Sequence, residues 1–182
     1  MTISGRRQLH ILALHGAGLL VATTAVPSSP NLGMAQGQCR PHEAGPAFIL
    51  QIVGIKDRVG LLRVEVYPSN DADFLQDDNV LVGQGKVFRR VETPVPKTGV
   101  IALCIRVPRA GSYAVSVLHD RDSSRKFSVM VDGVGFGGNP RIRLRKPRAA
   151  EATIRAGDGP TRRRIILNYH SGFMSFGPIG GR

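Results

Sequence analysis

The chain has 182 residues, a formal net charge of +12 and no tryptophan. This length fits one domain with its own hydrophobic core. The scarcity of aromatic rings argues against a reader of single-stranded nucleic acid, which stacks bases on such rings. No Walker motif, zinc-ligand spacing or catalytic carboxylate pair stands out, so we expect no cofactor.

The N-terminus has the pattern of a leader. Arg6 and Arg7 precede an apolar stretch over residues 11–26, and the first acidic residue is Glu43. The stretch is shorter than the roughly 20 residues that cross a bilayer. A positive start followed by a short apolar run is typical of a secretory signal peptide. We therefore expect a periplasmic or secreted protein whose mature chain has no transmembrane segment.

Two positions fit cleavage after a small residue: Ala25, with Thr23 at −3, and Ala35, with Gly33 at −3. The Pro- and Ser-rich stretch 26–34 favours Ala35. The signal peptide would then cover residues 1–35. The twin-arginine pattern around the leader's two arginines is incomplete, which favours ordinary secretion.

The two cysteines, Cys39 and Cys104, both lie in the mature part. In an oxidising compartment such a pair indicates a disulfide. Closing a loop of about 65 residues would stabilise the fold by roughly 4 kcal/mol. The bond would tie the lead segment 36–47 to the domain. Cys39 lacks the small and apolar neighbours of a lipoprotein box, so we expect no lipid anchor.

Residues 48–170 form a series of short apolar or alternating segments separated by Gly and Pro. The strands we expect are 48–53, 62–67, 100–105, 113–118, 127–131, 142–144, 152–154 and 165–169. Seven to nine strands at this spacing predict an all-β, antiparallel β-sandwich of the Ig-like or prealbumin-like kind. A small β-barrel is the alternative. We expect a polar loop at 71–79, with room for a helical turn, and a flexible tail at 171–182.

Positive charge concentrates in the second half. Residues 109–182 hold 14 Lys and Arg against 5 Asp and Glu. On a strand, Arg141, Arg143 and Arg145 would point to one face and form a candidate anion-binding stripe. Such a stripe favours an anionic glycan or envelope polymer, such as lipopolysaccharide. The other interpretation, which the sequence favours, is that the charge only keeps the protein soluble.

The most specific pattern lies between residues 111 and 139. Its members are Gly111, Tyr113, Ala114, His119, Asp120, Gly135, Phe136 and Asn139. With this pattern the chain resembles DUF2141, an uncharacterised family of exported domains. That family carries Gly-x-Tyr-Ala and then His-Asp along a strand, followed by a polar loop and a Gly-Phe turn. The resemblance covers roughly residues 48–169. It implies a β-sandwich behind a signal peptide and supplies no activity.

The loop after His-Asp in that family resembles the alternating oxygen ligands of a Ca²⁺ loop. In this chain the alternate positions hold Asp120, Asp122 and Ser124, which are the candidate metal ligands. Basic residues surround them at 121, 125 and 126, and cations around carboxylates oppose metal binding. We therefore expect a structural loop without a metal.

Catalytic interpretations have less support. His119 and Asp120 are adjacent on a strand and so point to opposite faces, and no nucleophile elbow is present. The Gly133-x-Gly135-x-x-Gly138 match to a dinucleotide motif leads into another strand rather than a helix. We expect a non-catalytic exported protein that binds an anionic envelope component or a protein partner. A carbohydrate-binding module and a hydrolase using His119 and Asp120 are the alternatives.

Overall fold

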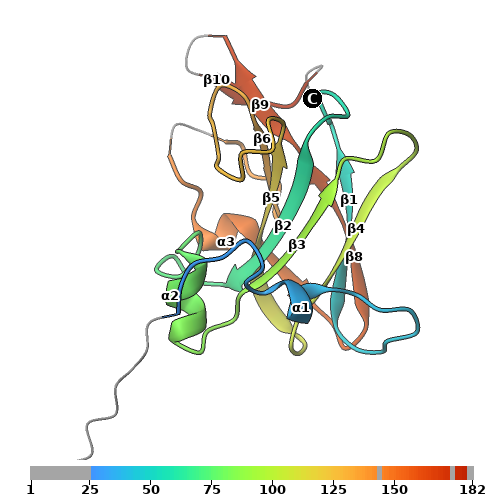
Figure 1. Ribbon diagram of the computed structural model, residues 1–182, viewed down its shortest axis with the longest axis vertical. Coiled ribbons are helices and arrows are strands. Elements are labelled where there is room, and N and C mark those ends of the chain that lie inside the picture. Colours follow the sequence, from blue (N-terminus) through green and yellow to red (C-terminus); the bar gives the residue numbers. More distant parts are fainter. Residues whose placement is uncertain (1–25, 143–144, 173–174, 180–182) are drawn as a thin grey trace, which may run out of the picture.

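Two β-sheets packed face to face make up the protein (Figure 1). The computed structural model describes residues 26–142, 145–172 and 175–179. These residues contain ten strands and three short helices, and the sheets do not close into a barrel. The predicted all-β sandwich is confirmed, and the barrel alternative is wrong. No helix in this described part is long and apolar enough to cross a bilayer.

The smaller sheet has the order β4-β1-β8. Its central strand, β1 (Ala47–Val53), pairs antiparallel with β4 (Ile101–Arg106) and parallel with β8 (Pro160–Ile166). The parallel pair departs from the purely antiparallel arrangement that we expected. It arises because the chain passes through the larger sheet before it returns to β1, and parallel neighbours need such a crossover.

The larger sheet has the order β10-β9-β6-β5-β2-β3, and a further strand, β7, also pairs with β5. Its strands are β2 (Leu61–Pro68), β3 (Arg89–Pro94), β5 (Gly111–Asp120), β6 (Gly133–Phe136), β7 (Thr153–Ala156), β9 (Asn168–Ser171) and β10 (Ser175–Gly177). The ten-residue β5 is the centre of this sheet, because it pairs with β2, β6 and β7.

Four strands form where we expected them, at 48–53, 62–67, 100–105 and 113–118. The predicted strand at 165–169 is instead the junction of β8 and β9. Strands β3 and β6 escaped prediction because β3 carries Arg, Glu and Pro and β6 carries two glycines, which are poor strand formers.

Other segments differ from expectation. The predicted strand at 127–131 is wrong, because these residues form turns. Of the predicted strand at 152–154, residues 153 and 154 belong to β7. Residue 152 is instead the last residue of the short helix α3 (Ala149–Ala152). Of 142–144, residue 142 lies outside any strand, and 143 and 144 lie outside the described residues. In the expected tail, β10 pairs with β9.

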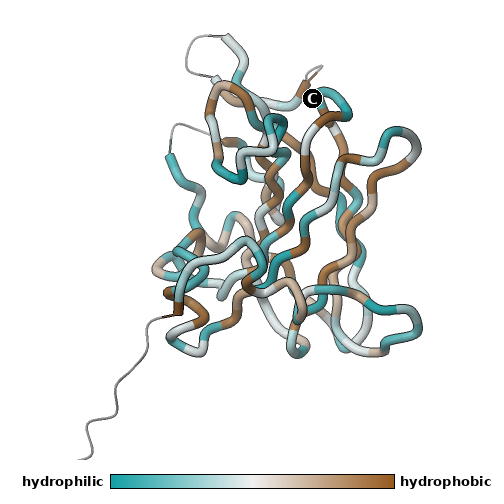
Figure 2. The backbone as a smooth tube through the Cα atoms, in the orientation of Figure 1, coloured by the Kyte–Doolittle hydropathy of each residue, from teal (hydrophilic) through white to brown (hydrophobic). Residues whose placement is uncertain are grey.

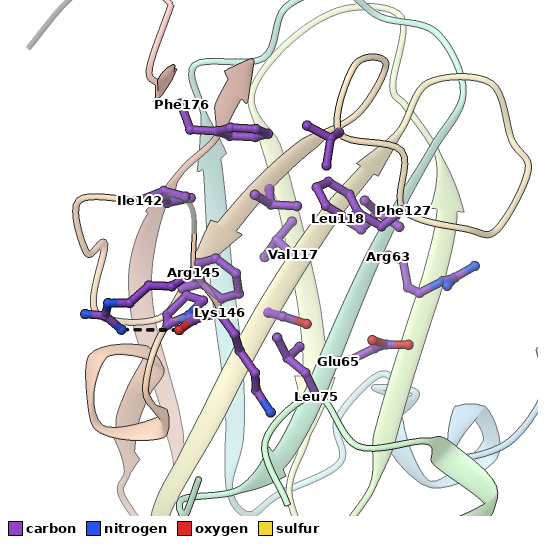
Figure 3. Close-up of a pocket in the computed structure, with 15 residues that line it drawn as sticks. Arg63, Glu65, Leu75, Val117, Leu118, Phe127, Ile142, Arg145, Lys146 and Phe176 are labelled. Carbon is purple, nitrogen blue, oxygen red and sulfur yellow. Dashed lines mark hydrogen bonds between the residues drawn. The ribbon is translucent and has the colours of Figure 1, made fainter. Parts of the chain in front are cut away.

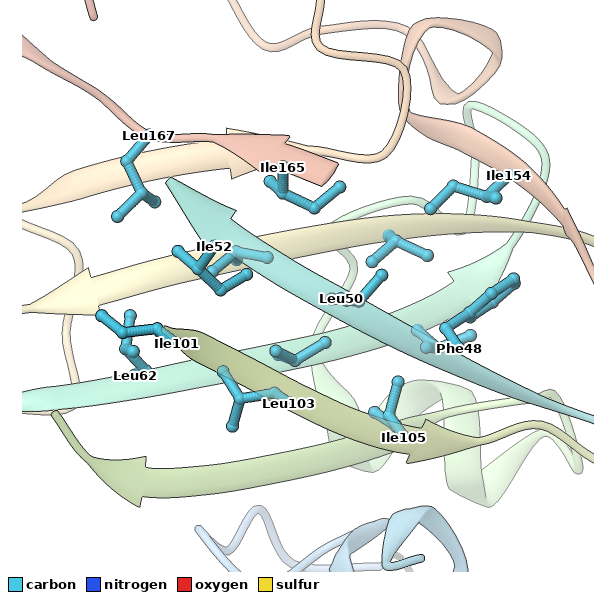
Figure 4. Close-up of a cluster of buried hydrophobic side chains, with 14 of the residues drawn as sticks. Phe48, Leu50, Ile52, Leu62, Ile101, Leu103, Ile105, Ile154, Ile165 and Leu167 are labelled. Carbon is cyan, nitrogen blue, oxygen red and sulfur yellow. The ribbon is translucent and has the colours of Figure 1, made fainter. Parts of the chain in front are cut away.

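The main core lies between the two sheets (Figure 4). Alternate side chains of each strand point into it, and Figure 2 shows this alternation of hydropathy along the strands. The labelled members come from both sheets: Phe48, Leu50, Ile52, Leu62, Ile101, Leu103, Ile105, Ile154, Ile165 and Leu167. Each fully buried aliphatic or Phe side chain contributes about 1.5–3 kcal/mol. The sandwich is therefore stabilised mainly by the hydrophobic residues whose pattern along the chain predicted the strands.

A second hydrophobic cluster covers one end of the outer face of the larger sheet. The helices α2 (Asp78–Gly83) and α3 lie at this end with their connecting loops (Figure 1). The buried members of the cluster are Tyr67, Phe74, Leu81, Phe88, Ala114, Phe136, Ala149 and Ala152. In the described part of the chain no helix covers the rest of that outer face.

The segment before the first strand belongs to the fold. The buried Arg90 guanidinium pairs with Glu65 at 2.8 Å and Asp78 at 3.1 Å, and also donates to the carbonyl oxygens of Ser29 and Pro30 at 3.0 and 3.3 Å. The Ser28 hydroxyl donates to Asp78 at 2.6 Å. Residues 28–35, which the leader assignment 1–35 would remove, therefore satisfy a buried charge.

The predicted disulfide between Cys39 and Cys104 is confirmed, with Cα atoms 5.9 Å apart. It follows helix α1 (Met34–Gly37) and joins the N-terminal segment to β4. Next to it, Gln38 forms an isolated bridge with Ile105. The N-terminal segment is thus tied to both sheets, covalently to the smaller one and through Arg90 to the larger.

We predict that a chain of residues 36–182 is less stable than one of residues 26–182. Without Ser29 and Pro30 the buried Arg90 loses two carbonyl acceptors, and hydrogen bonds to a charged group contribute about 1.5–3 kcal/mol each. We expect the free energy of unfolding to fall by roughly 2–4 kcal/mol in urea titrations under oxidising conditions. Equal stability of the two chains would contradict a structural role for this segment.

Candidate functional site

His119, at the end of β5, lies fully buried between the sheets. Its Nε2–H donates to the Val59 carbonyl oxygen at 2.9 Å, since a carbonyl can only accept. Its Nδ1 therefore accepts from the Tyr169 hydroxyl at 2.7 Å, and that hydroxyl accepts from the Lys56 amide at 3.1 Å. Burial lowers the pKa of His119, so the ring is held neutral. Both ring nitrogens are occupied by structural partners.

Asp57, and not Asp120, is the carboxylate near His119, with Oδ1 3.8 Å from Nε2. Arg121 holds that carboxylate through Nε–H bonds of 2.9 and 3.1 Å and a further bond from Nη2. The hydrogen bond from Arg121 lowers the pKa of Asp57. The carboxylate is thus fixed as an ion pair with arginine. Sequence patterns could not indicate this contact, because Asp57 lies 62 positions before His119 in the chain.

Asp120 points to the opposite face, as the strand alternation required. Its carboxylate accepts hydrogen bonds from the Ser124 and Arg125 amides at 3.0 and 2.7 Å, and burial raises its pKa. Asp132 similarly accepts from the amides of Arg121 and Ser128 at 2.9 and 2.7 Å. These two buried carboxylates organise the loop between β5 and β6.

The candidate metal ligands are only partly brought together. Asp120, Asp122 and Asp132 offer oxygens within 4.8 Å of one another, whereas Ser124 turns its hydroxyl to the Lys126 carbonyl. The alternate-position pattern did not include Asp132, because Asp132 lies eight residues after Ser124, the last position of that pattern. The oxygens of Asp120 and Asp132 all accept loop amides, so their observed contacts are those of a turn that carboxylates cap.

The expected arginine stripe is not seen as a strand. Arg141 lies in irregular chain, and Arg143 lies outside the described residues. Arg145 makes two hydrogen bonds of 3.2 Å with Glu151. Arg141 and Arg145 instead line one shallow hollow together with Glu151.

The uncovered part of the larger sheet's outer face forms a groove of about 580 Å³ (Figure 3). Two cross-strand rows make its floor, because the same β5 residues pair with β2 on one side and β6 on the other. One row is Arg63, Leu118 and Val134, and the other is Glu65, Ser116 and Phe136.

The walls of the groove come from loops and from β10. Phe127 and Val129 lie in the turn segment that follows β5, and they are 50% and 47% exposed. The remaining wall residues are Leu75, Ile142, Arg145, Lys146, Pro147 and Phe176. This volume is within the usual range for small-molecule sites, and the lining is mostly apolar, as in such sites. We name this hollow the outer groove.

The outer groove has an apolar end and a charged end. Phe176 lies at one end, and Lys146 extends toward Leu75 and Glu65 at the other (Figure 3). The Lys146 Nζ lies 5.7 Å from the centre of the buried Phe74 ring, a cation–π arrangement. Over the whole groove three lining residues are cationic and one is acidic, and this balance favours an anion.

Sequence reasoning missed the outer groove although its signs were present. Leu118 and Val134 are apolar on strand positions that point away from the main core. The apolar residues at 127–131 predict a strand, whereas they lie in a loop from which Phe127 and Val129 border the groove. An apolar residue on the outer face of a strand was therefore the available indication.

Several residues of the family pattern have structural roles. Gly135 faces the core, where an added Cβ would lie 2.7 Å from an Ile165 methyl carbon. The Asn139 side chain donates to the Arg164 carbonyl and accepts from the Ile166 amide, which links the end of β6 to β8. The buried Tyr113 hydroxyl donates to the Arg109 carbonyl at 2.9 Å. These residues of the family pattern thus make contacts within and between the two sheets.

The fold and the outer groove define a β-sandwich with a ligand-sized hollow on one sheet. The family described as "Uncharacterized protein conserved in bacteria (DUF2141)" matches residues 50–164. This match covers more than half of the chain, and the protein belongs to that family. No curated protein and no solved structure matches the chain.

We predict that stability falls on mild acidification because of His119. The folded state disfavours the protonated ring, whereas an unfolded histidine gains its proton near pH 6.5. The unfolded chain then binds more protons, so the free energy of unfolding decreases as the pH falls below about 6.5. Urea titrations at about pH 7.5 and 5.5 would measure this loss.

A His119→Gln variant should lose less stability between these two pH values, because the amide does not titrate. The exposed His42 provides the matched control, and His42→Gln should behave as the parent does. The same pH dependence in the parent and in His119→Gln would contradict the assignment.

Proposed function

We propose that this protein is an exported, non-catalytic binding protein that takes an anionic ligand in the outer groove. The observation that carries the proposal is the groove itself, which is open and mostly apolar, with the cationic Lys146 at the end opposite Phe176. The binding of an anionic envelope component or of a protein partner fits such a surface.

The absence of catalysis is supported by the placement of His119 and Asp120. Their side chains lie on opposite faces of β5, both are fully buried, and both are hydrogen-bonded within the fold. A hydrolase would need a base and a nucleophile that converge on one accessible point. The groove floor carries Ser116, but none of the described residues that line the groove is a histidine.

Carbohydrate binding through an aromatic platform has little support. The chain contains no tryptophan and three tyrosines. All three tyrosines, Tyr67, Tyr113 and Tyr169, are buried. An anionic partner agrees better with the net charge of +12, which raises the local concentration of polyanions around the protein.

Export is the second part of the proposal. The leader pattern supports it, and the disulfide agrees with an oxidising compartment. We propose a periplasmic or secreted protein that is cleaved after Ala25, rather than after Ala35 as the sequence pattern favoured. Cleavage after Ala25 retains Ser28, Ser29 and Pro30, which bind Asp78 and Arg90.

The mass of the exported protein tests this cleavage. When the full chain is expressed in a bacterium with an outer membrane, we expect the periplasmic or culture fraction to hold a form that begins at Val26. Intact-mass spectrometry under oxidising conditions would show it with its disulfide formed. A form that begins at Gln36, or a full-length protein confined to the cytoplasm, would contradict the proposal.

Binding to envelope components tests the function. Residues 26–182 are mixed with lipopolysaccharide, an acidic polysaccharide and vesicles of anionic phospholipid, each at low and high salt. We expect saturable binding to at least one of them, weakened by salt because charge contributes. Lys146→Glu should weaken it by about tenfold, a change of about 1.4 kcal/mol.

Lys97 supplies the matched control, because it is an exposed lysine at a distance from the outer groove. Lys97→Glu should bind as the parent does. Equal losses for the two variants would show that only net charge matters. The absence of binding to every component would contradict an anionic envelope ligand.

A further inference from the structure

We infer that the outer groove binds a long-chain carboxylic acid, with its carboxylate at Lys146 and its chain along the floor toward Phe176. This inference rests on the proposed function and names its ligand class. Three features of the groove carry it: an apolar strip of its floor, loops that expose large apolar side chains beside that strip, and a cation, Lys146, that has no acidic partner among the described residues.

The floor suits a hydrocarbon chain. Leu118 and Val134 are opposite each other on β5 and β6, and Phe136 follows two residues later on the same face. Phe176 lies at the end far from Lys146 (Figure 3). An extended alkyl chain along these residues would remove apolar surface from water, which favours binding.

Two loops beside the groove expose apolar surface that the domain itself does not bury. Phe127, Val129 and Leu75 are 50%, 47% and 38% exposed. They are not scattered, because all three line the same hollow. The capped turn holds Phe127 and Val129 there, since Asp132 binds the amide of Ser128 between them. Contiguous exposed apolar surface in a hollow is typical of a ligand site.

The charged residues that line the outer groove favour a ligand with one anionic group. Arg63 pairs with Glu92 at 3.0 Å, Glu65 with Arg90 at 2.8 Å, and Arg145 with Glu151 at 3.2 Å. Lys146 is exposed, and across the described ranges no carboxylate lies within 4.0 Å of its Nζ. A head group with one negative charge would pair with Lys146. A polyanion would have to displace the carboxylates that already pair with Arg63 and Arg145.

Other occupants fit less well. A polysaccharide would leave the apolar floor without a partner, and a second copy of this net positive chain would bring like charges together. A carboxylic acid with a long chain satisfies both ends of the groove at once. A phospholipid in a bilayer offers similar chemistry, and the experiment separates it from the free acid.

The test uses residues 26–182 and cis-parinaric acid, a fluorescent long-chain fatty acid. We expect saturable binding that hexadecanoic acid displaces more effectively than hexadecanol, which has the same chain without the charge. Phe127→Ser should weaken binding by about tenfold, because it removes roughly half of the burial of a Phe side chain. Lys146→Met should weaken binding of the acid by roughly 3- to 10-fold and abolish its advantage over the alcohol.

The chain offers close controls for both variants. Met130 lies in the same loop as Phe127, is 70% exposed and does not line the outer groove. Met130→Ser and Lys97→Met should bind the acid as the parent does. Val129→Ser is a second groove variant, with the same expected direction as Phe127→Ser, in case one substitution alters the loop.

Three outcomes would overturn the inference. These are no saturable binding of the acid, equal displacement by the acid and the alcohol, or losses in Met130→Ser that match those in Phe127→Ser. If the acid fails but lipopolysaccharide or anionic vesicles still bind in a way that depends on Lys146, the proposed function stands and the ligand class is wrong. A dimer that Phe127→Ser dissociates would identify a second copy as the occupant.

Discussion

The alternation of side chains along β5 is the constraint on which the arrangement of this protein depends. Residues 113, 115 and 117 enter the main core, whereas 114, 116 and 118 face outward. The outward series begins under the second hydrophobic cluster, continues along the groove floor and ends at the buried Asp120. A single strand therefore separates the two members of the His-Asp pair and also places the outer groove between the helical cover and the carboxylate-capped loop.

The buried histidine and the buried aspartates stabilise different parts of the fold. On the core side, His119 is neutral and connects the Val59 carbonyl to Tyr169. On the other side, Asp120 and Asp132 collect four backbone amides of the loop between β5 and β6. Because the loop is fixed by its backbone, its side chains remain available, and two of the apolar ones border the groove. The buried carboxylates of Asp120 and Asp132 thus hold the loop in a conformation that leaves Phe127 and Val129 exposed.

Most of the sandwich could be predicted from sequence, because period-two alternation and turn residues report directly on half-buried strands. β2 and β5 show this well. The parallel pairing of β1 with β8 could not be predicted, since it depends on the path of the chain between the sheets. β6 escaped because its two glycines leave space for Tyr169 and Ile165, a packing reason that composition does not reveal.

The candidate site was harder to predict than the fold. The disulfide followed from the cysteine count, and the separation of His119 from Asp120 followed from strand geometry. The outer groove did not follow, because its walls come from segments distant in sequence, around residues 75, 127, 146 and 176. The arginine residues at 141 and 145 attracted attention through their number. In the described part of the chain Arg145 pairs with Glu151, whereas no carboxylate pairs with Lys146, and only the three-dimensional arrangement shows this difference.

The glycines of β6 connect the interior of the sandwich to its outer surface. Added side chains at Gly133 and Gly135 would overlap Tyr169 and Ile165, so the strand rests directly on core side chains. Val134 and Phe136, on the reverse face of the same short strand, form part of the groove floor. The depth of the floor is therefore set by the thickness of the core beneath it. Among members of the family, a change in the volume of core residues at 165 or 169 would alter the dimensions of the hollow without any substitution in its lining.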